Sequence, residues 1–208
     1  MSDNTSSPDL RSRLRQGMRD QVRATAIDLM LERGFAATSV DDIVTASGVS
    51  RRSFYRYFGT REDLVLGATD DQVKILMNAL DARPPDEDAW TALQRAAESL
   101  PDADQPRERT LAFARLVHSD PDLRARQLEQ HAAWRAALAP LIEQRTRRSA
   151  TPLDQLGATA LVAAALTCLD VATEAWIRQN GTTPLSNLYE RAVAAVRGGQ
   201  APDVRLLR

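Results

Sequence analysis

The sequence predicts an all-α protein in which an N-terminal three-helix unit precedes a longer helical unit. Apolar residues recur at helical spacing, as in Val22, Ala26 and Met30, and no run alternates with period two for long enough to form a strand. Glycines, prolines and Asp/Ser clusters separate these apolar patterns. We expect a domain boundary near residue 66, which gives units of residues 1–66 and 67–208.

The first unit should contain three helices with clear local start and stop signals. Small polar residues accept hydrogen bonds from the first free amides of a helix, and glycine readily adopts the left-handed conformation that ends one. The expected caps are Thr38-Ser39, Ser50 and Thr60, and the expected stops are Gly34, Gly48 and Gly59. After Thr60 we expect one long helix that runs to Arg83, before Pro84-Pro85.

Beyond the double proline, longer helical patterns predict the second unit. Pro140 should kink one of these helices, because it lacks an amide hydrogen and its ring crowds the preceding turn. The segment 157–172 is apolar on every side and should therefore be buried. We place helices at residues 87–100, 107–118, 122–147, 153–179 and 185–197.

Composition and length limit the function classes. The chain has 208 residues, 43% of them hydrophobic, and a formal net charge of -1. A single cysteine, Cys168, excludes an intramolecular disulfide framework and suits a reducing compartment. The first twenty residues contain no apolar core of a signal peptide, and the longest run without charged or amide side chains, 156–169, is shorter than the roughly 17 residues that span a bilayer. We therefore expect a cytoplasmic protein with no membrane segment.

The segment ASGVSRRSFYRYF, residues 46–58, has an unusual local charge. From Gly48 to Arg61 there are four arginines and no acid, whereas nearly all the rest of the chain mixes both signs. At about 100° per residue, Phe54 and Phe58 share a buried side while Arg52 and Arg56 point the opposite way. Such a helix suits a DNA major groove, because arginine bonds guanine bidentately and hydroxyls bond phosphates. The alternative is a solvated arginine face that binds nothing.

Residues 34–65, GFAATSVDDIVTASGVSRRSFYRYFGTREDLV, resemble the N-terminal DNA-binding domain of TetR/AcrR-type transcriptional regulators. The resemblance implies a homodimer that places its third helices, one from each subunit, in successive major grooves of a palindromic, double-stranded operator. Arg61, Ser53 and Arg52 differ from the usual family residues, which leaves the operator sequence open. The resemblance assigns Arg51, Arg52 and Ser53 to bases, Tyr55 and Tyr57 to backbone phosphates, and Ser39 and Arg61 to flanking phosphates; helix geometry adds Arg56.

The second unit is similar to a branch of these regulators that binds acyl-CoA-like ligands, in residues 120–145 and 174–181. This similarity implies a small apolar or acyl-type effector, and segments 157–172 and 185–196 fit the family's dimerisation pair. Ligand sites are mostly apolar with a few polar groups, so polar and aromatic residues inside the helices are candidates. These candidates are His118, His131, Trp134, Asp170 and Trp176. For both tryptophans a place in the hydrophobic core is the more common alternative, and Asp170 would equally fit an exposed edge.

An enzyme is the main alternative, but the sequence contains none of several common catalytic or metal-binding motifs. The two histidines lie thirteen residues apart, there is one cysteine, and neither G-x-S-x-G nor G-x-x-x-x-G-K occurs. We therefore expect no catalytic residues, no metal and no cofactor. The sequence predicts a ligand-responsive DNA-binding regulator, a repressor, and the alternatives are a helical protein-binding adaptor or a small helical enzyme.

Overall fold

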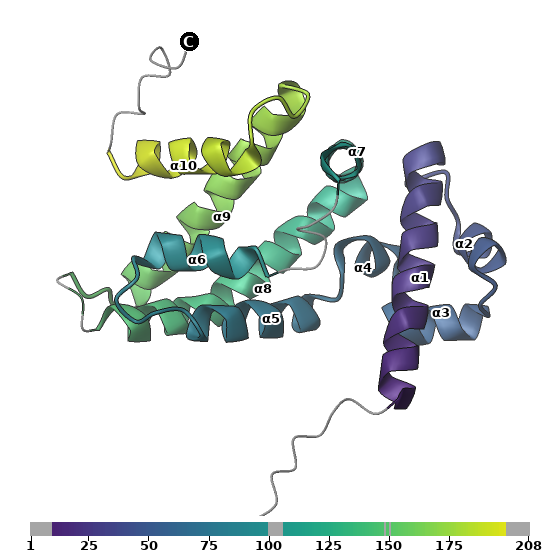
Figure 1. Ribbon diagram of the computed structural model, residues 1–208, viewed down its shortest axis with the longest axis horizontal. Helices are drawn as coiled ribbons and strands as arrows, with labels where there is room; N and C mark the ends of the chain where they lie inside the picture. Colours follow the sequence, from purple (N-terminus) through teal and green to yellow (C-terminus); the bar gives the residue numbers. More distant parts are fainter. Residues whose placement is uncertain (1–9, 100–105, 148, 150, 199–208) are drawn as a thin grey trace, which may run out of the picture. The chain divides into compact units, whose positions relative to one another are not determined.

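The computed structural model describes residues 10–99, 106–147, 149 and 151–198, and the chain divides into two compact units, Met1–Ala68 and Thr69–Arg208 (Figure 1). The regular secondary structure of the described residues is entirely helical, which confirms the predicted all-α class. The expected helix end at Leu100 lies outside the described residues.

In its described residues, the first unit packs three helices and a short fourth one around a small apolar core. Helix α1 contacts α2 and α4, and α3 contacts α2 and α4. Val22, Ala26 and Met30 recur every four residues along α1 and are fully buried, as their spacing predicts. The helices are α1 (Leu10–Arg33), α2 (Val40–Ser47), α3 (Arg51–Phe58) and α4 (Arg61–Leu66).

Local signals fix the helix boundaries in this unit. Ser39 and Asp42 form a reciprocal capping box at the start of α2, and Ser50 accepts a hydrogen bond from the Ser53 amide at 3.1 Å at the start of α3. Gly48 ends α2 with φ 69°, a left-handed conformation that glycine adopts without strain. The turn between α2 and α3 is therefore specified by residues within it.

The expectation of one long helix from Thr60 to Arg83 is wrong. Helix α4 ends at Leu66, Gly67 has φ 83° and ψ 154°, and a separate helix begins at Thr69. The guanidinium of Arg23 donates to the carbonyls of Leu64 at 3.1 Å and Val65 at 2.9 Å. These carbonyls belong to the last turn of α4 and would bond to following amides if the helix continued. Arg23 of α1 donates to them instead and caps the end of α4.

In its described residues, the second unit has six helices around two apolar clusters. One cluster joins α5, α6, α8 and α9, and the other joins α7, α9 and α10. Helix α8 continues through Pro140. The helices are α5 (Thr69–Asp81), α6 (Ala89–Ala97), α7 (Arg107–Ser119), α8 (Pro121–Thr146), α9 (Gln155–Arg178) and α10 (Leu185–Val196).

Within the described part of one chain, helix α9 is buried along one face, and its expected burial on every side, which requires a second subunit, stays a prediction. Ala158, Val162 and Ala165 lie in the core, whereas Leu156 is 78% exposed and Val171 is 50% exposed. Helices α6, α7, α8 and α10 contact α9, and the described part of the chain leaves Leu156, Ala160 and Val171 of α9 exposed. By length and composition α9 would suffice to cross a membrane, a property that it shares with core helices of soluble proteins.

Candidate nucleic-acid interface and polar cluster

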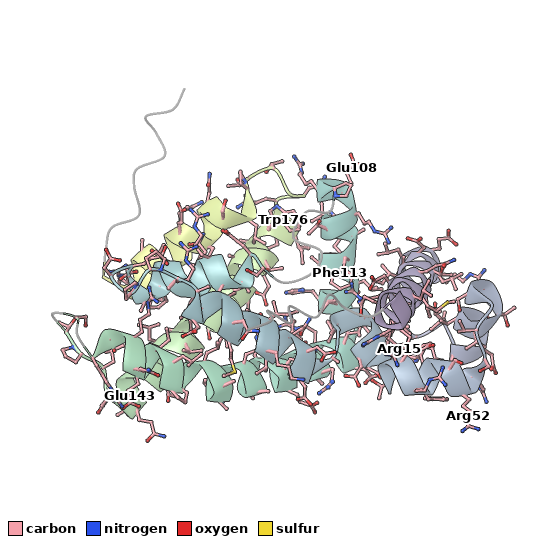
Figure 2. All side chains as sticks on the ribbon, turned by 60° about the horizontal axis from the view of Figure 1, so that its bottom comes forward. Arg15, Arg52, Glu108, Phe113, Glu143 and Trp176 are labelled. Carbon is pink, nitrogen blue, oxygen red and sulfur yellow. The ribbon has the colours of Figure 1, made fainter. Side chains whose placement is uncertain are left out.

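The third helix separates its aromatic and cationic residues onto opposite sides. Phe54 is fully buried and Phe58 is 9% exposed, with their ring centroids 5.6 Å apart. Arg52 is exposed, and Figure 2 shows it extending from α3 away from the rest of the first unit. The predicted orientation of the helix is therefore confirmed, because a packed inner face leaves the outer face free for solvent or a partner.

The three arginines of α3 differ in the partners that they already have. Arg51 forms a bidentate ion pair with Asp41 of α2, with Nε to Oδ1 at 2.7 Å and Nη2 to Oδ2 at 2.9 Å. Arg56 donates to the Tyr57 hydroxyl at 3.1 Å and lies 4.9 Å from that ring's centroid. Within the described part of the chain, the Arg52 side chain forms no hydrogen bond or ion pair. Arg52 thus has all its donors available.

The remaining predicted contacts differ in exposure. Tyr55 is 52% exposed at the side of α3, where its ring meets Phe54 edge-on at 5.3 Å. The Ser53 hydroxyl accepts a weak hydrogen bond from Arg56 at 3.4 Å. Ser39 is exposed at the start of α2, where its hydrogen bonds hold the pKa of the Asp42 carboxyl below its usual range. Its hydroxyl is therefore engaged in capping.

Arg61 has a role inside the domain that the sequence reading missed. Its guanidinium donates to the carbonyls of Phe35, at 3.1 Å, and Thr38, and it lies 4.4 Å from the centroid of the Phe35 ring. These contacts tie the start of α4 to the loop between α1 and α2. No local pattern signals them, because the two partners precede Arg61 by more than twenty residues.

Three of the predicted effector residues lie together between α8 and α9. His131 is 7% exposed, with Nδ1 3.4 Å from Oδ2 of Asp170, so the two form an ion pair when the imidazole is protonated. The His131 and Trp134 rings have centroids 5.2 Å apart. Trp134 is 7% exposed, and its indole Nε1 has no partner among the described residues. A buried N–H without an acceptor is costly, so this donor requires an explanation.

His118 brings α7 to the same cluster. Its Nδ1 lies 3.0 Å from the Ala114 carbonyl, whereas its Nε2 is buried and unpartnered among the described residues. Burial lowers the pKa of His118 and the charge of Arg124 acts in the same direction, while Glu174 and Asp170 raise it. Arg124 and Glu174, which the sequence reading missed, pair at 3.4 Å. We call these residues the polar cluster: His118, Arg124, His131, Trp134, Asp170 and Glu174.

Trp176 lies in a different environment from the polar cluster. It is 5% exposed and belongs to the apolar cluster of α7, α9 and α10, whereas Trp134 belongs to the other one. Cys168 is 3% exposed in the same cluster as Trp176, and burial raises the pKa of its thiol. The thiol is consequently neutral and inert, as expected for a small core residue.

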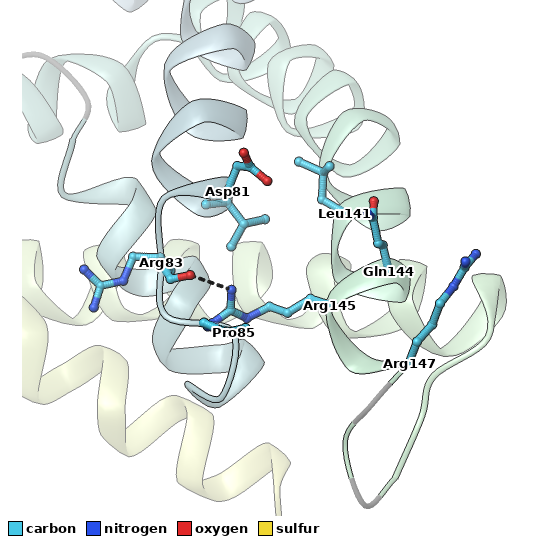
Figure 3. A pocket seen from close by; sticks show the side chains of 8 residues that line it. Asp81, Arg83, Pro85, Leu141, Gln144, Arg145 and Arg147 are labelled. Carbon is cyan, nitrogen blue, oxygen red and sulfur yellow. Dashed lines mark hydrogen bonds between the residues drawn. The ribbon is translucent and has the colours of Figure 1, made fainter.

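A surface cleft of about 630 Å³ opens between the ends of α5 and α8, away from the predicted effector residues (Figure 3). Arg145 crosses it and donates to the carbonyl of Arg83 at 3.3 Å and to that of Pro84. Arg83 in turn pairs with Glu87 at 2.6 Å, which raises the pKa of the arginine and lowers that of the acid. Through these hydrogen bonds, Arg83 and Arg145 hold the loop after α5.

Two family models together match most of the chain. One, described as bacterial regulatory proteins of the tetR family, matches residues 22–68, and the other, described as the MftR C-terminal domain, matches residues 85–201. The chain belongs to the TetR family. The resemblance in residues 34–65 is thereby confirmed, and the protein is a DNA-binding transcriptional regulator. Regulators of this family bind operator DNA, form dimers and bind small effectors.

Individual relatives support this membership. The HTH-type transcriptional repressor Rv3405c of Mycobacterium tuberculosis is 33% identical over 159 residues, which are 66% of this chain and 81% of the repressor. MftR of the same bacterium, a regulator named for mycofactocin biosynthesis, is 27% identical over 166 residues, 78% of this chain and 81% of MftR. These relatives are regulators and not enzymes.

Solved structures share the fold. FadR of Thermus thermophilus, a repressor crystallised with lauroyl-CoA, is 20% identical with a TM-score of 0.51, over 89% of this chain and 98% of FadR. Native NalD of Pseudomonas aeruginosa, a repressor of a multidrug efflux pump, is 19% identical with a TM-score of 0.53, over 90% of this chain and 99% of NalD.

Proposed function

We propose that this TetR-family regulator is a ligand-responsive repressor that leaves a palindromic operator when a small effector binds. The observation that carries the proposal is the outer face of α3, where Arg52 is exposed and unpaired beside Arg51 and Arg56. Arginine reads guanine in the major groove through two parallel hydrogen bonds. The first unit is then the DNA-binding domain, and the second is the effector-binding and dimerisation domain.

The assigned contacts divide into base contacts and phosphate contacts. Arg51, Arg52, Ser53 and Arg56 face bases, and the hydroxyls of Tyr55 and Tyr57 reach backbone phosphates. Ser39 and Arg61 are assigned to flanking phosphates near helix starts, where amides already favour an anion. Their existing hydrogen bonds leave each with fewer donors for DNA, so we assign them a smaller share of the affinity.

The effector site is proposed at the polar cluster, with His118, His131, Trp134 and Asp170 as its lining residues. Two buried ring nitrogens without partners support this choice, since a ligand could accept from Trp134 and interact with His118 Nε2. Trp176 is proposed to close the apolar end of the site. An acyl-type effector suits apolar helices with few polar groups, and the FadR structure contains such a molecule.

Dimerisation is proposed through the uncovered face of α9 together with α10. Leu156, Ala160 and Val171 are exposed on that face within one chain, which leaves an apolar surface of a 24-residue helix in water. Pairing α9 and α10 with their copies would form a four-helix bundle and bury it. We infer that the protein acts in the cytoplasm, where the operator DNA is located.

The switch is proposed to work by linkage between the two sites. An effector that binds one conformer of the dimer about 10⁴-fold more tightly than the other can shift the equilibrium almost completely. A population that is nearly all in the weakly binding conformer then becomes nearly all the tightly binding one. Because Gly67 separates α4 from α5, the change passes through a non-helical joint rather than through one continuous helix.

Selection of bound duplexes from a random DNA pool tests the proposal. A palindromic consensus should emerge, and affinity for it should fall steeply as salt rises, because phosphate contacts release counterions. A long-chain acyl-CoA should then release the selected duplex. The absence of any salt-dependent duplex binding would favour a protein-binding adaptor or an enzyme instead.

A further inference from the structure

The first helix begins well before the folded core of its domain. Helix α1 starts at Leu10, yet the first buried residue among its described side chains is Val22, and the tetR family match also starts at residue 22. At 1.5 Å per residue, the segment from Leu10 to Gln21 is about 18 Å long. Among residues 14–21 of this segment, no side chain is buried.

This segment carries a stripe of arginines. Residues 10–19 contain four arginines and no acid, a denser imbalance than that of the recognition segment. Arg15 and Arg19 are four residues apart in α1 and so take positions on one face, which we call the N-terminal arginine stripe. Arg23, four residues after Arg19, continues this spacing and caps α4.

The stripe is adjacent to the recognition helix. The Arg19 guanidinium lies 6.0 Å from the centroid of the Phe58 ring, at the end of α3. From there the helix continues outward, and in Figure 1 the purple first turns of α1 extend past α3. Arg15 is one helical turn farther out than Arg19 and is labelled in Figure 2. The stripe therefore begins where α3 ends.

Arg15 has no partner among the described residues that would stabilise α1. Like charges four residues apart in a helix destabilise it by a few tenths of a kcal/mol per pair. Arg15 is exposed and forms no hydrogen bond or ion pair with any residue that the structure describes, and the nearest acid in sequence, Asp20, accepts from Gln16 at 2.8 Å. An anionic partner would relieve this repulsion.

We propose that the N-terminal arginine stripe binds the phosphate backbone of the operator on the flank beyond the groove that α3 enters. This inference rests on the proposed function. It extends the DNA surface that the protein covers by a phosphate contact that does not distinguish between bases. DNA is the partner that matches, because the stripe continues the cationic surface of α3 within one unit, and duplex DNA presents one charge per about 1.7 Å of axis.

Trimming the operator tests this contact. The full-length dimer is titrated against a duplex with about ten flanking base pairs, one helical turn, on each side, and against a duplex trimmed to the core. Arg15→Gln removes two phosphate contacts per dimer, each worth a salt slope of about 0.9. We expect the slope on the long duplex to fall by about two, and the affinity at 0.1 M salt to fall by up to about 60-fold.

Two further variants separate charge from fold. Arg15→Lys should keep most of the affinity, since a phosphate contact needs a charge and not a planar fork. Arg135→Gln removes an exposed arginine of α8 that forms no ion pair among the described residues, so it should leave both titrations unchanged. On the trimmed duplex, Arg15→Gln and the unmodified protein should bind alike.

The opposite results would overturn the inference. A loss of affinity for Arg15→Gln that is equal on both duplexes would assign the residue to folding or to the core contact, and no loss on either would leave the stripe as a solvated face. If the unmodified protein bound no duplex at all, the proposed function itself would fail, so the two failures are distinguishable.

Discussion

Arg52→Ala is the sharpest perturbation of the proposed DNA interface. Arg52 is exposed and makes no hydrogen bond or ion pair within the described part of the chain, so its removal should change the unfolding free energy by at most about 0.5 kcal/mol. A lost bidentate base contact costs about 1–3 kcal/mol. Two such contacts per dimer give about 2–6 kcal/mol, a loss of affinity of about 30-fold to 20,000-fold.

The partners of the other arginines set the expected order of effects. Two donors of Arg51 are held by Asp41, and Arg56 is held by Tyr57. On binding DNA these side chains exchange one partner for another, which reduces their net gain. Substitution of Arg51 or Arg56 by alanine should therefore cost less operator affinity than Arg52→Ala.

Fluorescence anisotropy titrations at fixed salt, with the selected operator and a scrambled duplex, measure this effect. Arg52→Ala should weaken operator binding far more than binding to the scrambled duplex. Arg52→Lys keeps the charge but loses the planar fork, so it should resemble Arg52→Ala. Equal losses on the two duplexes, or normal operator binding by Arg52→Lys, would show that Arg52 contacts a phosphate and refute the assignment to bases.

Three other substitutions test the remaining structure. Arg61→Gln removes charged hydrogen bonds to two carbonyls, so thermal denaturation should show an unfolding free energy that is lower by about 1–3 kcal/mol. Unchanged stability would leave Arg61 with a role in phosphate binding alone. Ala160 lies on the exposed face of α9, so the Ala160→Arg chain should still fold. In the proposed dimer the arginine would be a buried unpaired charge, which should cost several kcal/mol of dimer stability. Sedimentation of this variant as a normal dimer would place the interface elsewhere. Burial keeps the pKa of His118 below 6.5, so the unfolded chain takes up its proton first as pH falls, and unfolding free energy should decrease below about pH 6.5. His118→Asn should flatten that decrease in urea titrations, and an unchanged pH profile would contradict the burial effect.

The α3 helix and its turn could be predicted from the sequence almost completely. Ser50 and Gly48 lie next to the boundaries that they set, and their caps depend only on adjacent backbone. The spacing of Phe54 and Phe58 fixes which side is buried, so the orientation of Arg52 follows from helix geometry. The spacing of the N-terminal arginine stripe could also be predicted from the sequence, because it depends only on helix periodicity.

Partners that are distant in sequence were decided only by tertiary structure. The capping of α4 by Arg23, the pairing of Arg51 with Asp41 and the position of Arg61 against Phe35 all join different helices or loops. The polar cluster likewise requires α7, α8 and α9 to meet, and the open face of α9 depends on which helices cover it. Local sequence determines caps, breaks and faces because these depend on neighbouring residues, whereas the partner of a side chain depends on how whole helices pack.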